Sequence, residues 1–167
     1  MSDGPDHIVT TGAMGAGKTT VGRLLSEALG LPFHDSDVTL ERRAGETGAE
    51  IAARDGVPRL HELELEVFLD LCEQSVRSVI APAASVVDHE TGRAALARNK
   101  TIWLTATDEA LAARTSHESH RRGVSATERA ALRRHRDPWL EDVYTMKVET
   151  TSRSPEETVA HILDRLD

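Results

Sequence analysis

A glycine-rich run near the start of the chain has the residue types and the spacing of a phosphate-binding loop. The run Gly12-Ala13-Met14-Gly15-Ala16-Gly17-Lys18-Thr19-Thr20 contains the pattern G-x-x-x-x-G-K-[ST]. Glycines let the backbone turn tightly and aim consecutive N–H groups at a phosphate, while Lys18 supplies a positive charge and the Thr19 hydroxyl can ligate Mg²⁺. The alternative is a turn that merely joins a strand to a helix. The complete motif favours a nucleoside triphosphate site that uses Mg²⁺.

The same loop occurs in GTPases, ATPases and kinases, so the loop alone does not choose between these classes. The chain contains no N-K-x-D stretch for reading guanine and no long insertion of the kind found in motor ATPases. It is also only 167 residues long. These features favour a kinase that acts on a small molecule.

Two carboxylates, Asp35 and Asp37, stand one residue apart where a second buried strand is expected to end. In a parallel sheet this point lies beside the loop that follows the first strand. Residues i and i+2 of an extended backbone point the same way. One acid could therefore serve the metal while the other orients and deprotonates an attacking hydroxyl. The alternative is that Asp35 or Ser36 only caps the following helix.

The composition limits the partners and the compartment. With 39% hydrophobic and 29% charged residues the chain should fold, and a net charge of −8 counts against nucleic acid or an anionic membrane. A single cysteine, Cys72, forms no internal disulfide. The sequence has no signal-peptide pattern and no apolar run of the roughly 20 residues that span a bilayer. We therefore expect a cytoplasmic monomer with residues 1–167 as a single domain.

Strand and helix patterns alternate along the whole chain, which is typical of a parallel sheet with helices on both faces. The expected strands are Ile8–Thr11, a short run ending at Phe33 or His34, 76–81, 101–105 and Met146–Glu149. The expected helices are Lys18–Leu29, 37–55 with breaks at Gly45 and Gly48, 58–71, Glu90–Arg98, Asp108–Thr115, an arginine-rich helix broken at Asp137-Pro138, and 155–166. Right-handed crossovers place the carboxyl ends of the strands at one edge, where we expect the chemistry.

The segment GAMGAGKTTVGRLLSEALGLPFHDSD resembles the opening of shikimate kinases, and the similarity extends over nearly the whole chain. The resemblance implies a P-loop α/β three-layer sandwich with a five-stranded parallel sheet and a mobile lid. It also implies an enzyme that uses ATP and Mg²⁺ to phosphorylate the 3-hydroxyl of shikimate. ATP, ADP and a small polar hydroxylated substrate are therefore the expected partners.

On the nucleotide side, the resemblance assigns roles to residues of several segments. Thr19 matches the metal-binding hydroxyl, and Asp35 matches the acid that helps to hold the Mg²⁺ shell. Arg114 in LAART matches the arginine that lies against the adenine, and Pro155 in SRSPEE matches a proline of the adenine-side loop.

The polar, aperiodic stretch 116–125 corresponds to the lid, which can close over the nucleotide and exclude water. Within it, Arg121 in SHRRGV best matches the arginine that reaches the phosphates, with Arg122 as the other choice. We expect Lys18 and this lid arginine to neutralise charge on the transferred phosphoryl group.

On the acceptor side, Asp37 matches the acid that grips and activates the substrate hydroxyl. Arg59 in VPRLHELE falls on the arginine of the family's F-R-x-x-E motif, and Arg136 in RRHRDPWLED falls on that of E-R-x-P-L-Y-x-E. Both motif arginines hold the substrate carboxylate. An arginine offers a planar fork for a carboxylate that lysine lacks.

The acceptor side also departs from the family pattern. A Gly-Gly-Gly run that packs against shikimate in the family corresponds here to segment 79–85 (VIAPAAS), which has no glycine. Three explanations follow: a kinase for another polar hydroxy compound, a divergent shikimate kinase, or a nucleotide-binding sensor without efficient transfer. The retained Asp37, Arg59 and Arg136 count against the sensor and favour an acceptor with a hydroxyl and an anionic group.

Overall fold

The computed structural model describes residues 6–115 and 124–166, in which strands and helices alternate as expected. The strands are β1 (Ile8–Thr11), β2 (Phe33–Asp35), β3 (Val79–Ala81), β4 (Lys100–Thr105) and β5 (Met146–Glu149). The helices are α1 (Lys18–Leu29), α2 (Ser36–Ala44), α3 (Gly48–Asp55), α4 (Val57–Cys72), the 3₁₀ helix η1 (Ala84–Asp88), α5 (Glu90–Arg98), α6 (Asp108–Thr115), α7 (Ala126–Glu141) and α8 (Pro155–Leu163).

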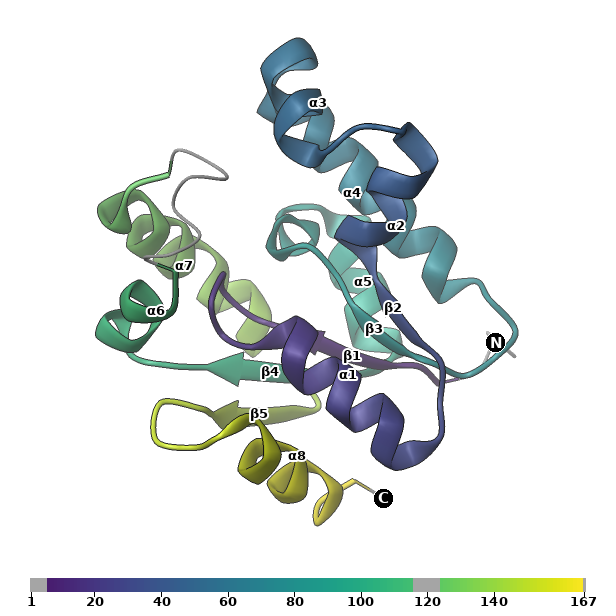
Figure 1. Ribbon diagram of the computed structural model, residues 1–167, viewed down its shortest axis with the longest axis vertical. Coiled ribbons are helices and arrows are strands. Elements are labelled where there is room, and N and C mark those ends of the chain that lie inside the picture. Colours follow the sequence, from purple (N-terminus) through teal and green to yellow (C-terminus); the bar gives the residue numbers. More distant parts are fainter. Residues whose placement is uncertain (1–5, 116–123, 167) are drawn as a thin grey trace.

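The strands form one parallel sheet in the order β2-β3-β1-β4-β5. All of their carboxyl ends therefore point the same way, toward the side where α6 and α7 lie in Figure 1. Strand β1 pairs with β3 on one side and with β4 on the other. The chain fills the β3 side of the sheet first and then crosses to the β4 side, so the loop after β1 lies where the direction of strand order reverses. In open parallel sheets this is the place where ligands bind.

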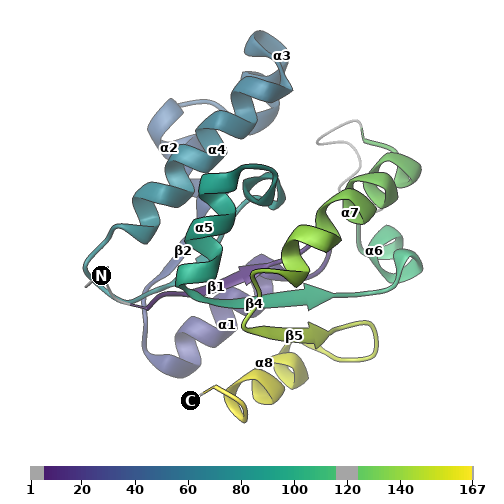
Figure 2. The same cartoon turned by 180° about the vertical axis from the view of Figure 1, so that it is seen from behind.

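Helices cover both faces of the sheet, which confirms the predicted three-layer sandwich. Helices α1 and α8 lie on the face toward the viewer in Figure 1, and Figure 2 shows α4, α5 and α7 on the opposite face. Successive β1 residues point to opposite faces, so Ile8 belongs to the cluster under α1 and α8, while Val9 belongs to the cluster under α4 and α5. The sheet thus separates two hydrophobic cores.

Several expected boundaries are wrong: β2 ends at Asp35 rather than at Phe33 or His34, and α8 ends at Leu163 rather than at residue 166. The break predicted at Pro138 does not occur, because α7 runs through this proline to Glu141. The prolyl ring removes one hydrogen bond, but Leu140 is buried in the core and holds the last turn in place. The third strand begins at Val79 rather than at residue 76, since Val76 is 60% exposed and lies outside the sheet.

The break between α2 and α3 is confirmed. Gly45 ends α2 in the left-handed conformation at φ +70°, and Thr47 caps α3 with its side chain. No helix among the described residues is long and apolar enough to cross a bilayer.

Candidate active site

The loop after β1 has a backbone that only glycine can support at two points. A Cβ on Gly12 would lie 2.4 Å from the carbonyl oxygen of Leu104, and one on Gly15 would lie 2.8 Å from Cγ2 of Thr115. Both glycines also have positive φ angles, +142° and +84°. The loop is therefore pressed against β4 and α6, and its conformation leads straight into the first turn of α1.

Lys18, the first residue of α1, is held at this loop. Its ammonium donates hydrogen bonds to the carbonyl oxygens of Gly12 at 2.9 Å and Ala13 at 3.2 Å. Thr10 fixes the backbone beneath it by donating to the Lys18 carbonyl at 2.9 Å. The positive charge of Lys18 therefore lies next to the loop that the motif predicts to bind phosphates.

Thr19 and Asp35 meet where the loop and the second strand adjoin. The Thr19 hydroxyl donates to Asp35 Oδ2 at 2.7 Å. Asp35 Oδ1 accepts the N–H groups of Asp37 at 2.9 Å and Val38 at 3.4 Å, so Asp35 also caps α2. The capping interpretation and the proximity to the phosphate loop are therefore both correct for this one side chain.

The sequence pattern predicted that Asp35 and Asp37 lie on one extended backbone, and this prediction is wrong. Asp35 ends β2, whereas Asp37 lies in the first turn of α2. The intervening Ser36 is buried, and its hydroxyl accepts the N–H of Ala83 at 2.9 Å. This bond ties the start of α2 to the segment after β3, so the helix turn, rather than strand alternation, positions Asp37.

Arg114, predicted on the nucleotide side, contacts the loop as well. Arg114 donates to the carbonyl oxygens of Gly15 at 3.2 Å and Thr150 at 2.8 Å, and so links the loop to the segment between β5 and α8. Pro155 opens α8, one residue after Ser154, which caps this helix. Arg121 and Arg122, expected in the lid, lie outside the described residues.

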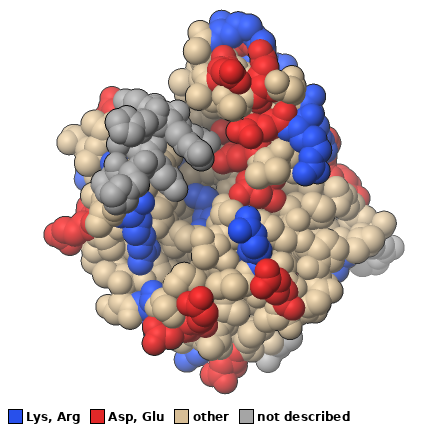
Figure 3. All heavy atoms as spheres, in the orientation of Figure 1, with Lys and Arg blue, Asp and Glu red and all other residues tan. Residues whose placement is uncertain are grey.

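A cavity of about 710 Å³ opens beside the phosphate loop. Figure 3 shows the hollow, which acidic side chains border on the side of α2 and α4. The loop residues Thr11, Gly12, Ala13 and Met14 form one wall. The other walls come from α3, α4, η1, α6 and α7, with the charged or polar lining residues His61, Glu64, Ser85, Asp108, Glu109, Arg129, Arg133, Arg136 and Asp137. Lys18, Thr19, Asp35 and Asp37 are not among the described residues that line it.

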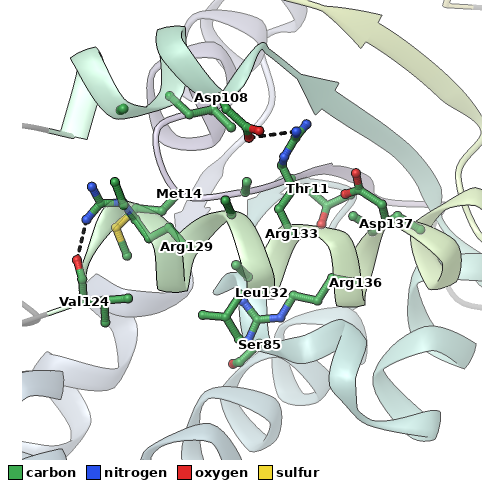
Figure 4. A pocket seen from close by; sticks show the side chains of 18 of the residues that line it. Thr11, Met14, Ser85, Asp108, Val124, Arg129, Leu132, Arg133, Arg136 and Asp137 are labelled. Carbon is green, nitrogen blue, oxygen red and sulfur yellow. Dashed lines mark hydrogen bonds and ion pairs between the residues drawn. The ribbon is translucent and has the colours of Figure 1, made fainter.

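Helix α7 presents three arginines to this cavity at helical spacing, as Figure 4 shows. Arg129 donates to the carbonyl oxygen of Val124 at 2.6 Å. Arg133 pairs with Asp108 at 2.7 Å, and its Nε is buried without a hydrogen-bond partner among the described residues. Near it, burial raises the pKa of Asp137 above its usual value, although the charge of Arg133 opposes the rise.

Arg136 forms the most enclosed ion pair of the cavity. Its Nε donates to Asp88 Oδ1 at 2.9 Å and a terminal nitrogen donates to Oδ2 at 2.8 Å. The side chains are only 12% and 25% exposed. Parallel double hydrogen bonds of this kind are the strongest geometry available to an arginine and a carboxylate. Asp88 is the last residue of η1.

Arg59, predicted to hold the substrate carboxylate, lies on the exposed side of α4. Its guanidinium is 47% exposed and pairs with Glu62 at 2.8 Å and Glu66 at 3.9 Å along α4. Arg59 does not line the cavity; the neighbouring His61 does. The helical period explains this difference between Arg59 and His61, because two residues along α4 turn the side chain to a different face.

Glu64 shares the cavity-facing side of α4 with His61. It is 2% exposed and accepts a hydrogen bond from the Ser85 hydroxyl at 2.5 Å. Glu64 is not among the site residues predicted from the sequence, although the sequence carries a signal for it. Glu64 falls on the buried stripe that Leu60, Val67 and Leu71 define at helical spacing. A carboxylate on such a stripe needs a polar partner.

Comparison with known proteins gives one consistent result. Residues 14–167 match the family model described as Shikimate kinase. The shikimate kinase of Pseudomonas entomophila is 36% identical over 165 residues, which cover 96% of this chain and 95% of that protein. The Thermobifida fusca shikimate kinase is 35% identical over 161 residues, covering 95% and 93%.

The structural comparison agrees. The structure of shikimate kinase from Acinetobacter baumannii in complex with shikimate superposes with a TM-score of 0.90 at 29% identity, covering 96% of this chain and 92% of that one. The Aquifex aeolicus shikimate kinase gives 0.82 at 29% identity.

Proposed function

From the premise that this chain belongs to the shikimate kinase family, a family of ATP-dependent phosphotransferases, we propose a specific reaction. The chain transfers the γ-phosphoryl group of ATP to a hydroxyl of a small polar metabolite, and shikimate is the first acceptor to test. The observation that carries this proposal is the 2.7 Å contact between Thr19 of the phosphate loop and Asp35. It brings the phosphate loop together with the acidic segment that includes Asp37.

The loop 12–20 would hold the triphosphate, and Thr19 and Asp35 would hold Mg²⁺. The chemistry of these two side chains fits this ion, since Mg²⁺ prefers oxygen ligands and keeps several sites for water and phosphate oxygens. The described residues contain no group of three acidic, histidine or cysteine side chains that could form a closed metal cage. Arg114 and Pro155 would border the adenine. When bound, Mg²⁺ supplies positive charge to the phosphate oxygens.

Asp37 would orient the acceptor hydroxyl and accept its proton as the oxygen attacks the γ-phosphorus. Lys18 and Arg121 would offset the negative charge that spreads over the transferred phosphoryl oxygens. This assignment makes the protein itself responsible for positioning and charge, which is where phosphoryl transfer gains most of its rate.

The acceptor is the finer part of the proposal. The sequence favours shikimate or, because segment 79–85 contains no glycine, another polar hydroxy metabolite with an anionic group. A nucleotide-binding sensor without efficient transfer is the competing function.

The deciding experiment is acceptor-dependent release of ADP, followed in a coupled assay with shikimate and with a panel of hydroxy acids, cyclitols and sugars. Acceptor-stimulated turnover with a preference for ATP over GTP supports the proposal. Tight nucleotide binding without stimulation by any acceptor would support the sensor instead.

We also propose that the chain acts as a cytoplasmic monomer with a single domain. Light scattering of the purified protein at micromolar concentration tests the monomer, and a single cooperative unfolding transition tests the single domain.

A further inference from the structure

We infer that the acceptor end of the cavity, formed by α4, η1 and the last two turns of α7, is built for an uncharged polyhydroxylated compound, such as a cyclitol, rather than for a carboxylate. The inference rests on the proposed kinase function and deepens it, replacing the anionic acceptor that the sequence favours. It is based on the ion pair between Arg136 and Asp88.

Arg136 is already occupied by the protein. Asp88 takes two of its nitrogens in parallel hydrogen bonds of 2.9 and 2.8 Å, and the pair is largely shielded from water. A substrate carboxylate could reach this guanidinium only by displacing Asp88, which would then lose its partner in a poorly hydrated place. Leaving one member of such a pair without its counter-charge is strongly unfavourable.

The other two arginines that line the cavity, and Arg59, do not replace Arg136 as a partner for a substrate carboxylate. Arg133 pairs with Asp108, and its remaining Nε is buried from solvent and hence from any ligand. Arg129 donates to the carbonyl oxygen of Val124 near the other end of α7. Arg59 pairs with Glu62 on the outer face of α4.

The family motif itself can be placed in a second register that the geometry prefers. F-R-x-x-E aligns with Leu60-His61-x-x-Glu64, and all three of these residues line the cavity. In that register a histidine stands where the motif has its carboxylate-binding arginine. The acceptor end then brings together the carboxylates of Glu64 and Asp88, and Asp137 in the last two turns of α7 also lines the cavity.

The polar residues that line this end suit hydroxyls. The carboxylate oxygens of Glu64 can accept a hydrogen bond from an alcohol, and the Ser85 hydroxyl can donate or accept. Leu60 and Ala84 add apolar surface that a ring face can cover. An uncharged polyol therefore gains hydrogen bonds without placing a further negative charge beside these carboxylates.

The first test uses the wild-type protein loaded with Mg²⁺ and ADP, and calorimetric titration with two matched ligands. One is shikimate, and the other is its alcohol, in which a hydroxymethyl group replaces the carboxylate on the same ring. We expect the alcohol to bind about tenfold more tightly or better. Equal or tighter binding of shikimate, or no binding of the alcohol at about 10 mM, overturns the inference.

The second test removes the counter-charge with Asp88→Asn, which keeps the shape of the side chain. Arg136 then has an uncompensated charge, so affinity for shikimate should rise about tenfold while that for the alcohol changes less than about twofold. Asp70→Asn is the matched control, because Asp70 also pairs with an arginine, Arg43, but on the exposed surface. It should change neither affinity.

Melting curves show whether the variant folds, and the wild-type titration decides the question if it does not. Unchanged shikimate affinity in a folded Asp88→Asn protein contradicts the inference. Turnover assays distinguish failure of this inference from failure of the proposed kinase function. ADP release with shikimate as the preferred acceptor contradicts only the inference. Nucleotide binding without turnover of any acceptor contradicts the kinase function.

Discussion

The phosphate loop and the acceptor end of the cavity are built by different means. In the loop, backbone shape is set by glycines with positive φ and by the close approach of β4 and α6. At the acceptor end, side chains from α4, η1 and α7 form pairs with one another, such as Arg136 with Asp88 and Glu64 with Ser85. One region depends on a contiguous segment, and the other on contacts between residues far apart in the sequence.

This difference has a consequence for function. Backbone N–H groups and a fixed lysine suit the triphosphate, which is the same for every acceptor. Side-chain pairs can be exchanged one residue at a time, and each exchange changes the charge that an acceptor meets. We therefore expect variants of the loop to abolish turnover with every acceptor and variants of the acceptor end to change the preference among acceptors.

The largest expected effect tests the loop. Lys18→Ala should lower kcat about 10³-fold with any acceptor, because it removes the positive charge over the loop. Acceptor-dependent ADP release measures the loss. Lys147→Ala is the matched control, since Lys147 pairs with Glu141 on the exposed surface of β5, and its kcat should stay within about twofold of wild type. A comparable loss in both variants would contradict the special role of Lys18.

The loop could be predicted from the sequence for a physical reason. Its conformation depends on residues next to one another, so Gly12, Gly15, Lys18 and Thr19 are readable as a motif without knowledge of the fold. The alternation of strands and helices is likewise local, and it predicted the parallel sheet. The error at Pro138 arose because the tertiary contacts of Leu140 outweigh the local cost of the proline.

The second prediction concerns the boundary between the two regions. Asp37→Asn should lower kcat about 10²-fold, because the amide cannot accept the proton of the attacking hydroxyl. The affinity for ADP should stay within about twofold of wild type, since the neighbouring Thr19–Asp35 contact remains. Turnover assays and calorimetry with ADP give the two numbers. An equal loss of ADP affinity would place Asp37 on the nucleotide side rather than the acceptor side.

The acceptor end was harder to predict, because its residues are neighbours only in the folded chain. Nothing in the sequence joins Asp88 to Arg136, which are 48 residues apart. Arg59 and His61 differ by two positions, and the face that each occupies depends on the rotation of α4 against the sheet. The burial of Glu64 was the one readable signal, as a charged residue on an apolar stripe.

A smaller effect concerns the strand that carries Asp35. Burial, together with the nearby His7, lowers the pKa of His34 below its usual 6.5. The folded protein then binds a proton at His34 less readily than the unfolded chain does. This contribution to stability is complete above pH 6.5 and is lost as the pH falls toward the lowered pKa.

Melting temperatures between about pH 7.5 and pH 5 test this in wild type and in His34→Gln. As the pH falls over that range, the melting temperature of the wild type should decrease by about 1–2 °C more than that of the variant, because only the wild type has His34 to titrate. If the melting temperatures of the two proteins change in parallel with pH, His34 does not contribute to the pH dependence of stability.

The smallest expected effect is that of replacing Arg59, and it tests whether this residue belongs to the acceptor end of the cavity. Arg59→Ala should leave kcat/KM within about twofold of wild type for every acceptor, because the exposed pairs of Arg59 along α4 contribute little. Arg136→Ala, the matched variant, should lower the melting temperature and change acceptor affinity, since it leaves Asp88 without its partner. If Arg59→Ala instead weakened acceptor binding as much as Arg136→Ala, the first register of the F-R-x-x-E motif would be the functional one. Helix α4 would then have to turn Arg59 toward the cavity when the acceptor binds.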